Sequence, residues 1–262
     1  MLLYITVILI SAVIIFFAAL FISVARKYSK RPLDRIYHLL QQQTDFCSLK
    51  DVPERYISLL ICAEDKEFYQ HHGICISAIR EALKTNIKRK EFVIGGSTIT
   101  QQLVKNLYFY NYKKIWRKLQ EMLLAFIAER VLSKNELLEM YINIIYYGCG
   151  QFGITSASAY YFGKHPKDLT FNQIFLLIRI MNGPTKKNPL TYPEAYAKSR
   201  DFLVNLWEKE GVLSAEEAAL ILSYDRQKPD PELRDRTDEA ERFTVVPVLN
   251  ERYGCESGFG ES

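Results

Sequence analysis

The chain has 262 residues, of which 48% are hydrophobic and 24% charged, and its formal net charge is +4. This length allows one sizeable domain with appendages, and the composition excludes a chain that is disordered throughout. The mildly basic balance suits an anionic membrane surface or a phosphate-bearing ligand without requiring either. The five cysteines are odd in number and lack metal-type spacing, so they predict neither a zinc site nor a disulfide framework.

The first predicted element is a helix over residues 2–25, a run that contains no charged side chain. At 1.5 Å per residue this helix reaches about 36 Å, which is enough to cross a hydrocarbon core of about 30 Å with tilt. It is too long for a cleaved signal peptide and lacks the charged start of one, so we predict a single membrane anchor. Cations follow the helix and none precedes it. By the positive-inside rule this pattern keeps the rest of the chain in the cytoplasm, although large domains translocate regardless of flanking charge. The cations are Arg26, Lys27, Lys30, Arg31 and Arg35.

Three further segments follow the anchor. Residues 26–50 read as a polar linker with no firm period. Residues 51–224 show an almost wholly helical pattern that starts at Pro53 and contains no alternating strands. Residues 225–262, with their prolines and glycines, predict a poorly ordered tail.

A carboxylate interrupts an apolar helical face in the pattern that begins near Glu54. Glu64 stands where that face should be apolar. Such a carboxylate is unfavourable unless it is paired or used, and burial makes it a stronger base. The alternative is a half-exposed glutamate with a salt-bridge partner. The apolar members of the face are Ile57, Leu60, Ile61 and Phe68.

Two glycines, Gly95 and Gly96, precede a second informative helix. Thr98 and Gln101 have the spacing of a capping box. The free N–H groups of such a helix start, with the hydroxyls of Ser97 and Thr98, form a place where phosphate binds readily. An ordinary capped helix after a flexible loop is the alternative.

The helix expected over residues 115–132 carries Arg117, Lys118 and Glu121 at i, i+4 and i, i+3 spacing. As surface pairs these are worth about 0.3–0.5 kcal/mol each. On the wall of a cleft, the two cations and the carboxylate instead hold a pyrophosphate and supply a second acid group. We expect the buried stripe of this helix to consist of Ile115, Leu119, Met122, Phe126 and Ile127.

The glycines from Gly148 to Gly153 match the dinucleotide fingerprint G-x-G-x-x-G, but that fingerprint needs a strand before it. A helical run over residues 136–145 leads in, so we predict a tight connection between packed helices. His71 and His72 are adjacent and cannot imitate a zinc-binding pair one helical turn apart.

In this order and spacing the stretches resemble the glycosyltransferase 51 family. These peptidoglycan glycosyltransferases form the polymerase module of class A penicillin-binding proteins. The resemblance covers about residues 53–189, and the chain departs from it at Cys75, where the family often has Asp, and in the lead-in Arg179–Pro184. The first motif matches Glu64, Asp65, Phe68, His71 and Gly73; the second matches Gly95 or Gly96 through Gln102, then Lys105 and Asn106; the third matches Arg117, Lys118 and Glu121; the fourth matches Tyr141, Asn143, Gly148, Gly153 and Tyr161–Lys164; a weaker fifth matches Pro184 and Asn188–Pro189.

The resemblance implies a mainly α fold, with a lysozyme-like helical domain and a small membrane-facing jaw, after one transmembrane helix. It implies an inverting enzyme that polymerises lipid II into β-1,4-linked glycan strands and releases undecaprenyl pyrophosphate. No transpeptidase domain follows, so the monofunctional, membrane-anchored type is expected. Its place is the bacterial inner membrane, with the catalytic domain on the outer (periplasmic) face. The expected partners are lipid II, the growing glycan, membrane lipid and other cell-wall synthesis proteins, and not nucleic acid. The expected cofactor is a divalent cation, Mg²⁺ or Mn²⁺, with unassigned ligands and no organic cofactor.

Residue by residue, the resemblance makes Glu64 the general base and Glu121 the second carboxylate. Lys105, Arg117 and Lys118 would offset the charge of the departing pyrophosphate. Asp65 would tune Glu64 or bind the donor sugar. The other expected substrate-binding residues are Ser97, Thr98, Gln101, Gln102, Asn106 and Asn143.

Two rival functions share parts of this pattern. A lytic, lysozyme-like enzyme would use one glutamate to cleave glycan strands, but it has no need of the Ser97–Gln102 stretch or of the cations at Arg117 and Lys118. A non-catalytic membrane scaffold of the wall-synthesis machinery would not need Glu64 on an apolar stripe.

Overall fold

A computed structural model describes residues 1–91, 95–109, 115–184 and 188–223. The described residues are mainly helical, and they contain an isolated bridge between Tyr146 and Phe152 but no strand. The mainly α prediction is therefore confirmed. The helices are α1 (Leu2–Lys30), α2 (Leu33–Gln41), α3 (Glu54–Glu64), α4 (Ile76–Arg89), α5 (Ile99–Tyr108), α6 (Ile115–Val131), α7 (Lys134–Ile144), α8 (Ile154–Phe162), α9 (Phe171–Met181), α10 (Pro193–Lys209) and α11 (Ala215–Ser223).

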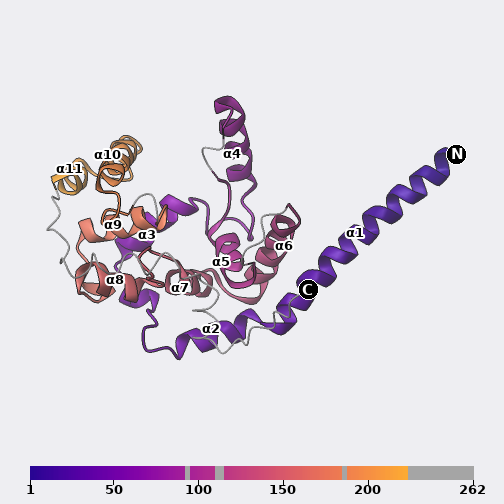
Figure 1. Cartoon of the computed structure of the whole chain (residues 1–262), viewed down its shortest axis with the longest axis horizontal. Helices are drawn as coiled ribbons and strands as arrows, with labels where there is room; N and C mark the ends of the chain where they lie inside the picture. Colours follow the sequence, from indigo (N-terminus) through magenta and orange to yellow (C-terminus); the bar gives the residue numbers. More distant parts are fainter. Residues whose placement is uncertain (92–94, 110–114, 185–187, 224–262) are drawn as a thin grey trace.

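Helix α1 projects from the body of the protein as a long arm with the N-terminus at its tip (Figure 1). Its apolar window has a mean hydropathy of 3.1 and is only 6% buried, so it is long and apolar enough to cross a membrane. The helix continues past the predicted end at residue 25, because its last turns pack on the body. There Val24 is fully buried, and Ser23 Oγ accepts a hydrogen bond of 2.7 Å from Gln120 Nε2 of α6.

The prediction of a linker over residues 26–50 is wrong. Much of this segment is α2, whose buried side chains recur at i, i+3, i+4 and i+7 and join the main core. The run of three glutamines at the end of α2 obscures that period in the sequence. The Tyr37 hydroxyl also donates a 2.6 Å hydrogen bond to Glu139 of α7. The buried residues of α2 are Leu33, Ile36, Tyr37 and Leu40.

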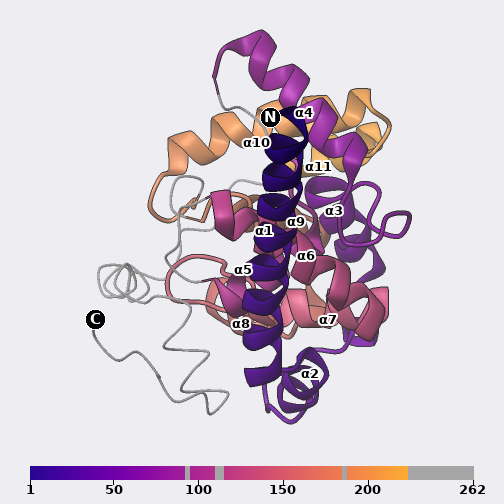
Figure 2. The same cartoon turned by 90° about the vertical axis from the view of Figure 1, so that its right-hand side faces the viewer.

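Helices α5, α7 and α9 form the centre of the body, and neighbouring helices pack against them. Helix α5 packs against α6 and α7, while α9 packs against α3 and α11. Figure 2 shows α1 in front of α5, α6 and α9, with α4 and α10 at one end of the body and α2 at the other. Helix α9 is buried from Gln173 through Met181, so its charged side chain at Arg179 is exceptional.

Helix α6 presents the face opposite to the one that the sequence predicts. Ile115 is 85% exposed and Phe126 38% exposed, so the predicted buried stripe is wrong. Small residues explain the difference, because they let α6 approach its neighbours closely. A Cβ on Gly73, which has φ +85°, would lie 2.7 Å from the backbone of Ala125. The buried residues of α6 are Gln120, Glu121, Leu124, Ala125 and Ala128.

The glycine-rich connection after α7 is the tight turn that the sequence predicts. The helix α7 leads into it, and Gly153 ends it as the N-cap of α8 with φ +81°. A Cβ at Gly153 would lie 2.6 Å from the carbonyl oxygen of Asn143. The chain therefore needs glycine here for close packing of α7 and α8, and the strand required for dinucleotide binding is absent from this part of the structure.

Buried weak acids in the core predict a loss of stability at high pH. Tyr56, Tyr141 and Tyr147 are fully buried, and the Tyr56 and Tyr147 hydroxyls are hydrogen-bonded to each other. Burial raises the pKa of all three phenols above the ordinary value of 10.0, and it raises the pKa of the Cys47 thiol from 9.0 to about 11. The unfolded chain thus ionises at lower pH than the folded chain, so this contribution is intact below about pH 9 and is lost as pH rises further.

We expect the melting temperature to change little between about pH 7 and 8.5 and to fall steeply above about pH 9.5. Tyrosinate absorbance should rise together with the loss of helical circular dichroism. Phenols that titrate near 10 while the helices remain intact would contradict this burial.

Candidate active site

Glu64 is the last residue of α3 and lies half-buried at the edge of that helix. The buried face of α3 is formed by Tyr56, Leu59 and Leu60, and Phe68 follows after the helix has ended, so the predicted single stripe is wrong in detail. Two side-chain amides hold the carboxylate. Gln102 Nε2 donates to Oε2 at 2.8 Å, and Asn182 Nδ2 donates to Oε1 at 2.9 Å. The carboxylate is thus fixed between α5 on one side and the end of α9 on the other.

Glu64 lines a cavity of about 650 Å³. The cavity lies between the end of α3, the start of α4, the segment before α5, the end of α9 and one face of α10 (Figure 1 shows these elements). Its polar wall includes Ser97, Arg179 and Asn182, and its apolar wall on α10 includes Phe202 and Leu206. A cavity of this size is typical of a ligand site. About half of its lining is polar or charged, and besides Glu64 it includes the carboxylates of Asp65, Glu67, Glu81 and Glu210.

A buried tyrosine sets the orientation of the Gln102 amide. The Tyr141 hydroxyl donates to Gln102 Oε1 at 3.0 Å, so the NH₂ group of Gln102 points toward Glu64. Because an ionised carboxylate only accepts hydrogen bonds, the NH₂ group of Gln102 faces Glu64, and the Tyr141 hydroxyl then holds this orientation by donating to the amide oxygen. The predicted substrate-binding residue Gln102 therefore also positions the candidate base.

Asp65 is buried and its carboxylate is occupied by protein groups. Oδ2 accepts the Ile99 backbone N–H at 3.0 Å and lies 2.9 Å from His71 Nε2. His71 Nδ1 lies 3.8 Å from Glu129, which also accepts the Thr100 hydroxyl at 2.6 Å. The geometry therefore makes Asp65 a residue that joins the end of α3 to the start of α5, and His71 a link between Asp65 and Glu129.

Thr98 and Gln101 form the capping box that the spacing predicts. Thr98 Oγ1 donates to the Gly73 carbonyl at 2.8 Å and accepts the Gln101 N–H, and both residues are only 1% exposed. The structure thus uses the Thr98 hydroxyl and Gln101 Oε1 at the helix start, whereas the buried Nε2 of Gln101 makes no hydrogen bond to the described residues. Thr98 and Ser97 both line the cavity, but Ser97 is partly exposed there.

A cationic cluster adjoins this wall of the cavity. Lys118 Nζ donates to Ser97 Oγ at 2.8 Å and lies 3.5 Å from Glu121 Oε2. Arg117 Nε lies 3.1 Å from Glu121 Oε1, which is close enough for an ion pair, but the two atoms are not aligned for a hydrogen bond. Glu121 is only 2% exposed, so the interpretation as a solvated surface pair is wrong. The cluster of Arg117, Lys118 and Glu121 connects to the cavity through Ser97.

Three predicted substrate-binding residues neither line the cavity nor bond to Glu64 or the cationic cluster. Lys105 is exposed on α5 and Asn106 is partly exposed beside it. Asn143 is buried and bonds to backbone groups. Its Oδ1 accepts the Cys47 N–H at 2.8 Å, and its Nδ2 donates to the carbonyls of Cys47 and Glu139 at 2.8 Å. The structure therefore gives Asn143 the role of fixing the segment after α2 on α7.

Sequence reasoning missed two side chains at the end of α9. Asn182 bonds to Glu64, and Arg179 is 6% exposed and lines the same cavity. An arginine within an apolar helix is the signal that the sequence offers, and it stands in the lead-in Arg179–Pro184 that departs from the family pattern.

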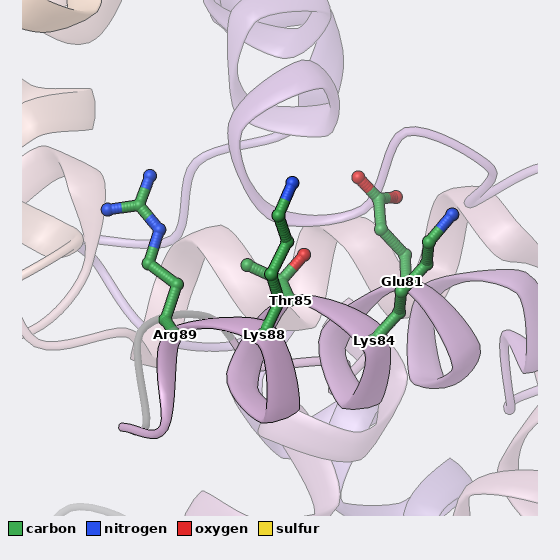
Figure 3. Close-up of a pocket in the computed structure, with 5 residues that line it drawn as sticks. All are labelled: Glu81, Lys84, Thr85, Lys88 and Arg89. Carbon is green, nitrogen blue, oxygen red and sulfur yellow. The ribbon is translucent and has the colours of Figure 1, made fainter.

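A second hollow, of about 590 Å³, lies on α4 and carries mostly charged side chains. All project from one side of the helix (Figure 3). Only Glu81 lines both hollows, and no predicted site residue lies in this second one. The lining residues are Glu81, Lys84, Thr85, Lys88 and Arg89.

The residues that the structure describes contain no group of three or more His, Cys, Asp or Glu side chains placed to hold a metal ion. Glu121 is the carboxylate of the cationic cluster, and its two oxygens face Arg117 and Lys118. These neighbouring positive charges oppose a second cation, so the expected Mg²⁺ or Mn²⁺ does not fit this donor set on its own.

A glutamate in a cavity wall beside a cationic cluster places a candidate general base next to groups that can bind an anion. The sequence profile described as "Transglycosylase" matches residues 30–207. The chain therefore belongs to the transglycosylase family.

Curated relatives agree with this membership. The chain is 35% identical over 215 residues to penicillin-binding protein 1F of Bacillus subtilis, an alignment that covers 82% of this chain and 30% of the relative. It is 36% identical to penicillin-binding protein 1A of Aquifex aeolicus, covering 67% of the chain and 24% of the relative, and 36% identical to penicillin-binding protein 1B of Vibrio cholerae, covering 67% and 23%. The chain thus spans between about a quarter and a third of the length of these relatives.

Proposed function

We propose that this protein polymerises lipid II into β-1,4-linked glycan strands and releases undecaprenyl pyrophosphate. The observation that carries the proposal is the carboxylate of Glu64, held by two amides in the wall of a cavity that is bordered by Ser97 and the cationic cluster. Membership of the transglycosylase family supports glycosyl transfer in general. The finer assignment of substrate and product rests on the chemistry that these residues offer.

Glu64 acts as the general base. Its carboxylate takes the proton of the acceptor's sugar 4-hydroxyl while that oxygen forms a bond to the anomeric carbon of the donor. The bond between that carbon and the donor diphosphate breaks, the diphosphate keeps the electron pair, and the anomeric centre inverts. A positioned general base contributes typically about 10²–10⁴-fold. The amides of Gln102 and Asn182 hold the carboxylate without neutralising it.

The departing diphosphate gains negative charge, which needs preorganised cations. Lys118 is placed for this role because Ser97 holds its ammonium group at the cavity wall. Glu121 orients Lys118 and Arg117 from behind, and its burial limits screening by water. In this proposal the chain's own cations offset the leaving-group charge, and Glu121 is a positioning residue.

Helix α1 serves as the membrane anchor of this enzyme. Substrate and product both stay bound to lipid, so a tethered catalytic domain meets them at high effective concentration. We place the domain on the outer face of the inner membrane, against the flanking positive charges. Protease added to intact spheroplasts should digest the body of the protein, and full protection by the membrane would contradict this orientation.

Incubation of the purified full chain with lipid II tests the activity directly. Polymer of increasing length, accompanied by undecaprenyl pyrophosphate, is the expected result. Release of soluble sugar fragments from preformed glycan would instead support the lytic alternative. If the protein formed neither polymer nor fragments, the result would support the non-catalytic scaffold.

Replacing Tyr141 by Phe should slow polymerisation because Gln102 loses the donor that fixes its amide. We expect the turnover rate to fall about 3- to 10-fold with an unchanged KM, and the stability to fall by about 1 kcal/mol from the lost hydrogen bond. Steady-state kinetics and thermal melting measure the two effects. Tyr146→Phe, on the neighbouring connection, is the control. An equal loss of rate in that variant would argue against the role of Tyr141 in orienting Gln102 toward Glu64.

A further inference from the structure

Arg179 is a buried cation that makes no hydrogen bond or ion pair with the described residues, although Glu64 and Tyr196 act on it electrostatically. It lies in the last turns of α9, is 6% exposed, and its Nε makes no hydrogen bond. A buried polar group without a partner is rare in folded proteins and calls for an explanation. The remainder of α9 is buried and largely apolar, so nothing in the packing of this helix requires a charge at this position.

The position of Arg179 in the cavity wall offers an explanation for this buried charge. Arg179 lines the cavity that contains Glu64, and it stands three residues before Asn182, so the two side chains share one face of α9. Asn182 bonds to Oε1 of Glu64, while Gln102 of α5 bonds to Oε2. Arg179 therefore lies on the α9 side of the carboxylate, and Ser97, which holds Lys118, lies on the α5 side.

The neighbouring charges leave Arg179 available to an anion. Burial lowers its pKa from 12.5, while Tyr196 and the Glu64 carboxylate act in the opposite direction. A guanidinium with this starting value stays charged at neutral pH. Among the described residues no ion pair joins Arg179 to Glu64, and Arg179 lines the cavity with an unused Nε donor.

We propose that Arg179 forms a second oxyanion-binding position in the cavity, on the α9 side of Glu64, which binds an anionic group of the acceptor substrate. The proposal rests on the proposed function, in which the cationic cluster on the α5 side takes the donor diphosphate. Glu64 then lies between the two anion positions, where the hydroxyl of a bound acceptor would come within hydrogen-bond reach of its carboxylate. The bound group is a diphosphate or a carboxylate, since a guanidinium binds both through paired N–H donors.

Binding of inorganic pyrophosphate to the full chain in detergent tests this position without relying on catalysis. Because Lys118 offers a competing site, titrations use Lys118→Met as background. In that background we expect Arg179→Met to weaken pyrophosphate binding at least about 10-fold, and Arg179→Lys to weaken it about 3-fold, since Lys keeps the charge but loses the planar fork. Arg200→Met, which removes a cation paired with Asp201 on α10 outside the cavity wall, is the matched control and should leave binding unchanged.

Acetate in the same titrations separates the two sources of the anion. Displacement of pyrophosphate by millimolar acetate assigns a carboxylate, and no displacement assigns a diphosphate. In polymerisation assays Arg179→Met should raise the apparent KM for lipid II about 10-fold with a smaller change in kcat. If Arg179 served only as a counter-charge for Glu64, its replacement would instead lower kcat.

Circular dichroism and thermal melting establish that each variant is folded. If Arg179→Met does not fold, the test uses Arg179→Lys in its place. Equal pyrophosphate affinity of the folded Arg179 variants and their background would overturn the proposal. Loss of pyrophosphate binding in a protein that makes no polymer would support the anion position and refute only the proposed function.

Discussion

The Glu64→Gln variant is expected to form almost no glycan polymer from lipid II, with a rate at least about 10²-fold below that of the unaltered chain. Glutamine has the shape of glutamate and can still accept a hydrogen bond from Gln102 or Asn182, but it cannot take a proton. The effect should therefore fall on the chemical step, so kcat drops while KM changes little. Quantitative separation of labelled glycan products measures the rate.

The matched control for this variant is Glu54→Gln. Glu54 begins the same helix α3, is exposed, and lies outside the cavity. The control should retain full activity, and both variants should melt within about 2 °C of the unaltered protein, since neither change creates a cavity or an unpaired charge. A Glu64→Gln enzyme with more than about a tenth of normal turnover would refute the assignment of Glu64 as general base.

Replacing Glu121 by Gln is expected to be nearly as damaging to activity, for a different reason. Glu121 is buried between Arg117 and Lys118, and its loss leaves two cations without their counter-charge. We expect polymerisation to fall about 10²-fold because Lys118 no longer has a fixed position beside Ser97. Stability should fall by about 1–3 kcal/mol, a moderate loss because Lys118 remains 41% exposed and can be hydrated.

Arg130→Gln controls for the removal of a charge from the same helix. Arg130 is exposed at the end of α6 and stacks on Phe126, so its replacement should affect neither activity nor fold. The kinetic signature of Glu121→Gln should be a raised KM for lipid II together with a lowered kcat, since the cations bind the diphosphate before and during its departure. Normal kinetics in a folded Glu121→Gln protein would remove this residue from the mechanism.

Several features of the molecule follow from local sequence alone. The capping box of Thr98 and Gln101 and the close connection at Gly153 depend on residues close together in the chain. Local backbone geometry and hydrogen bonding decide such features wherever the segment lies in the fold. The family is likewise evident from the order and spacing of the motifs, because each motif is a short run of neighbouring residues.

Periodicity is less reliable wherever the choice of buried face depends on a partner. The large apolar residues of α6 predict one face, but close packing of Ala125 against Gly73 selects the other and places Glu121 inside. The polar residues of segment 33–41 dominate its composition and conceal a helix, although its apolar residues have helical spacing. An apolar stripe indicates that a helix is packed, and the shape of its neighbours decides through which side chains.

The sequence by itself determined the helical class, the family and the identity of the candidate base. Only the tertiary structure decided which side chains surround that base. Asn182 and Arg179 are more than 110 positions from Glu64 in the chain. Because α9 packs against α3, Asn182 bonds to Glu64 and Arg179 lines the same cavity. Contacts at such separation depend on how whole helices pack, and no local pattern in the sequence specifies that packing.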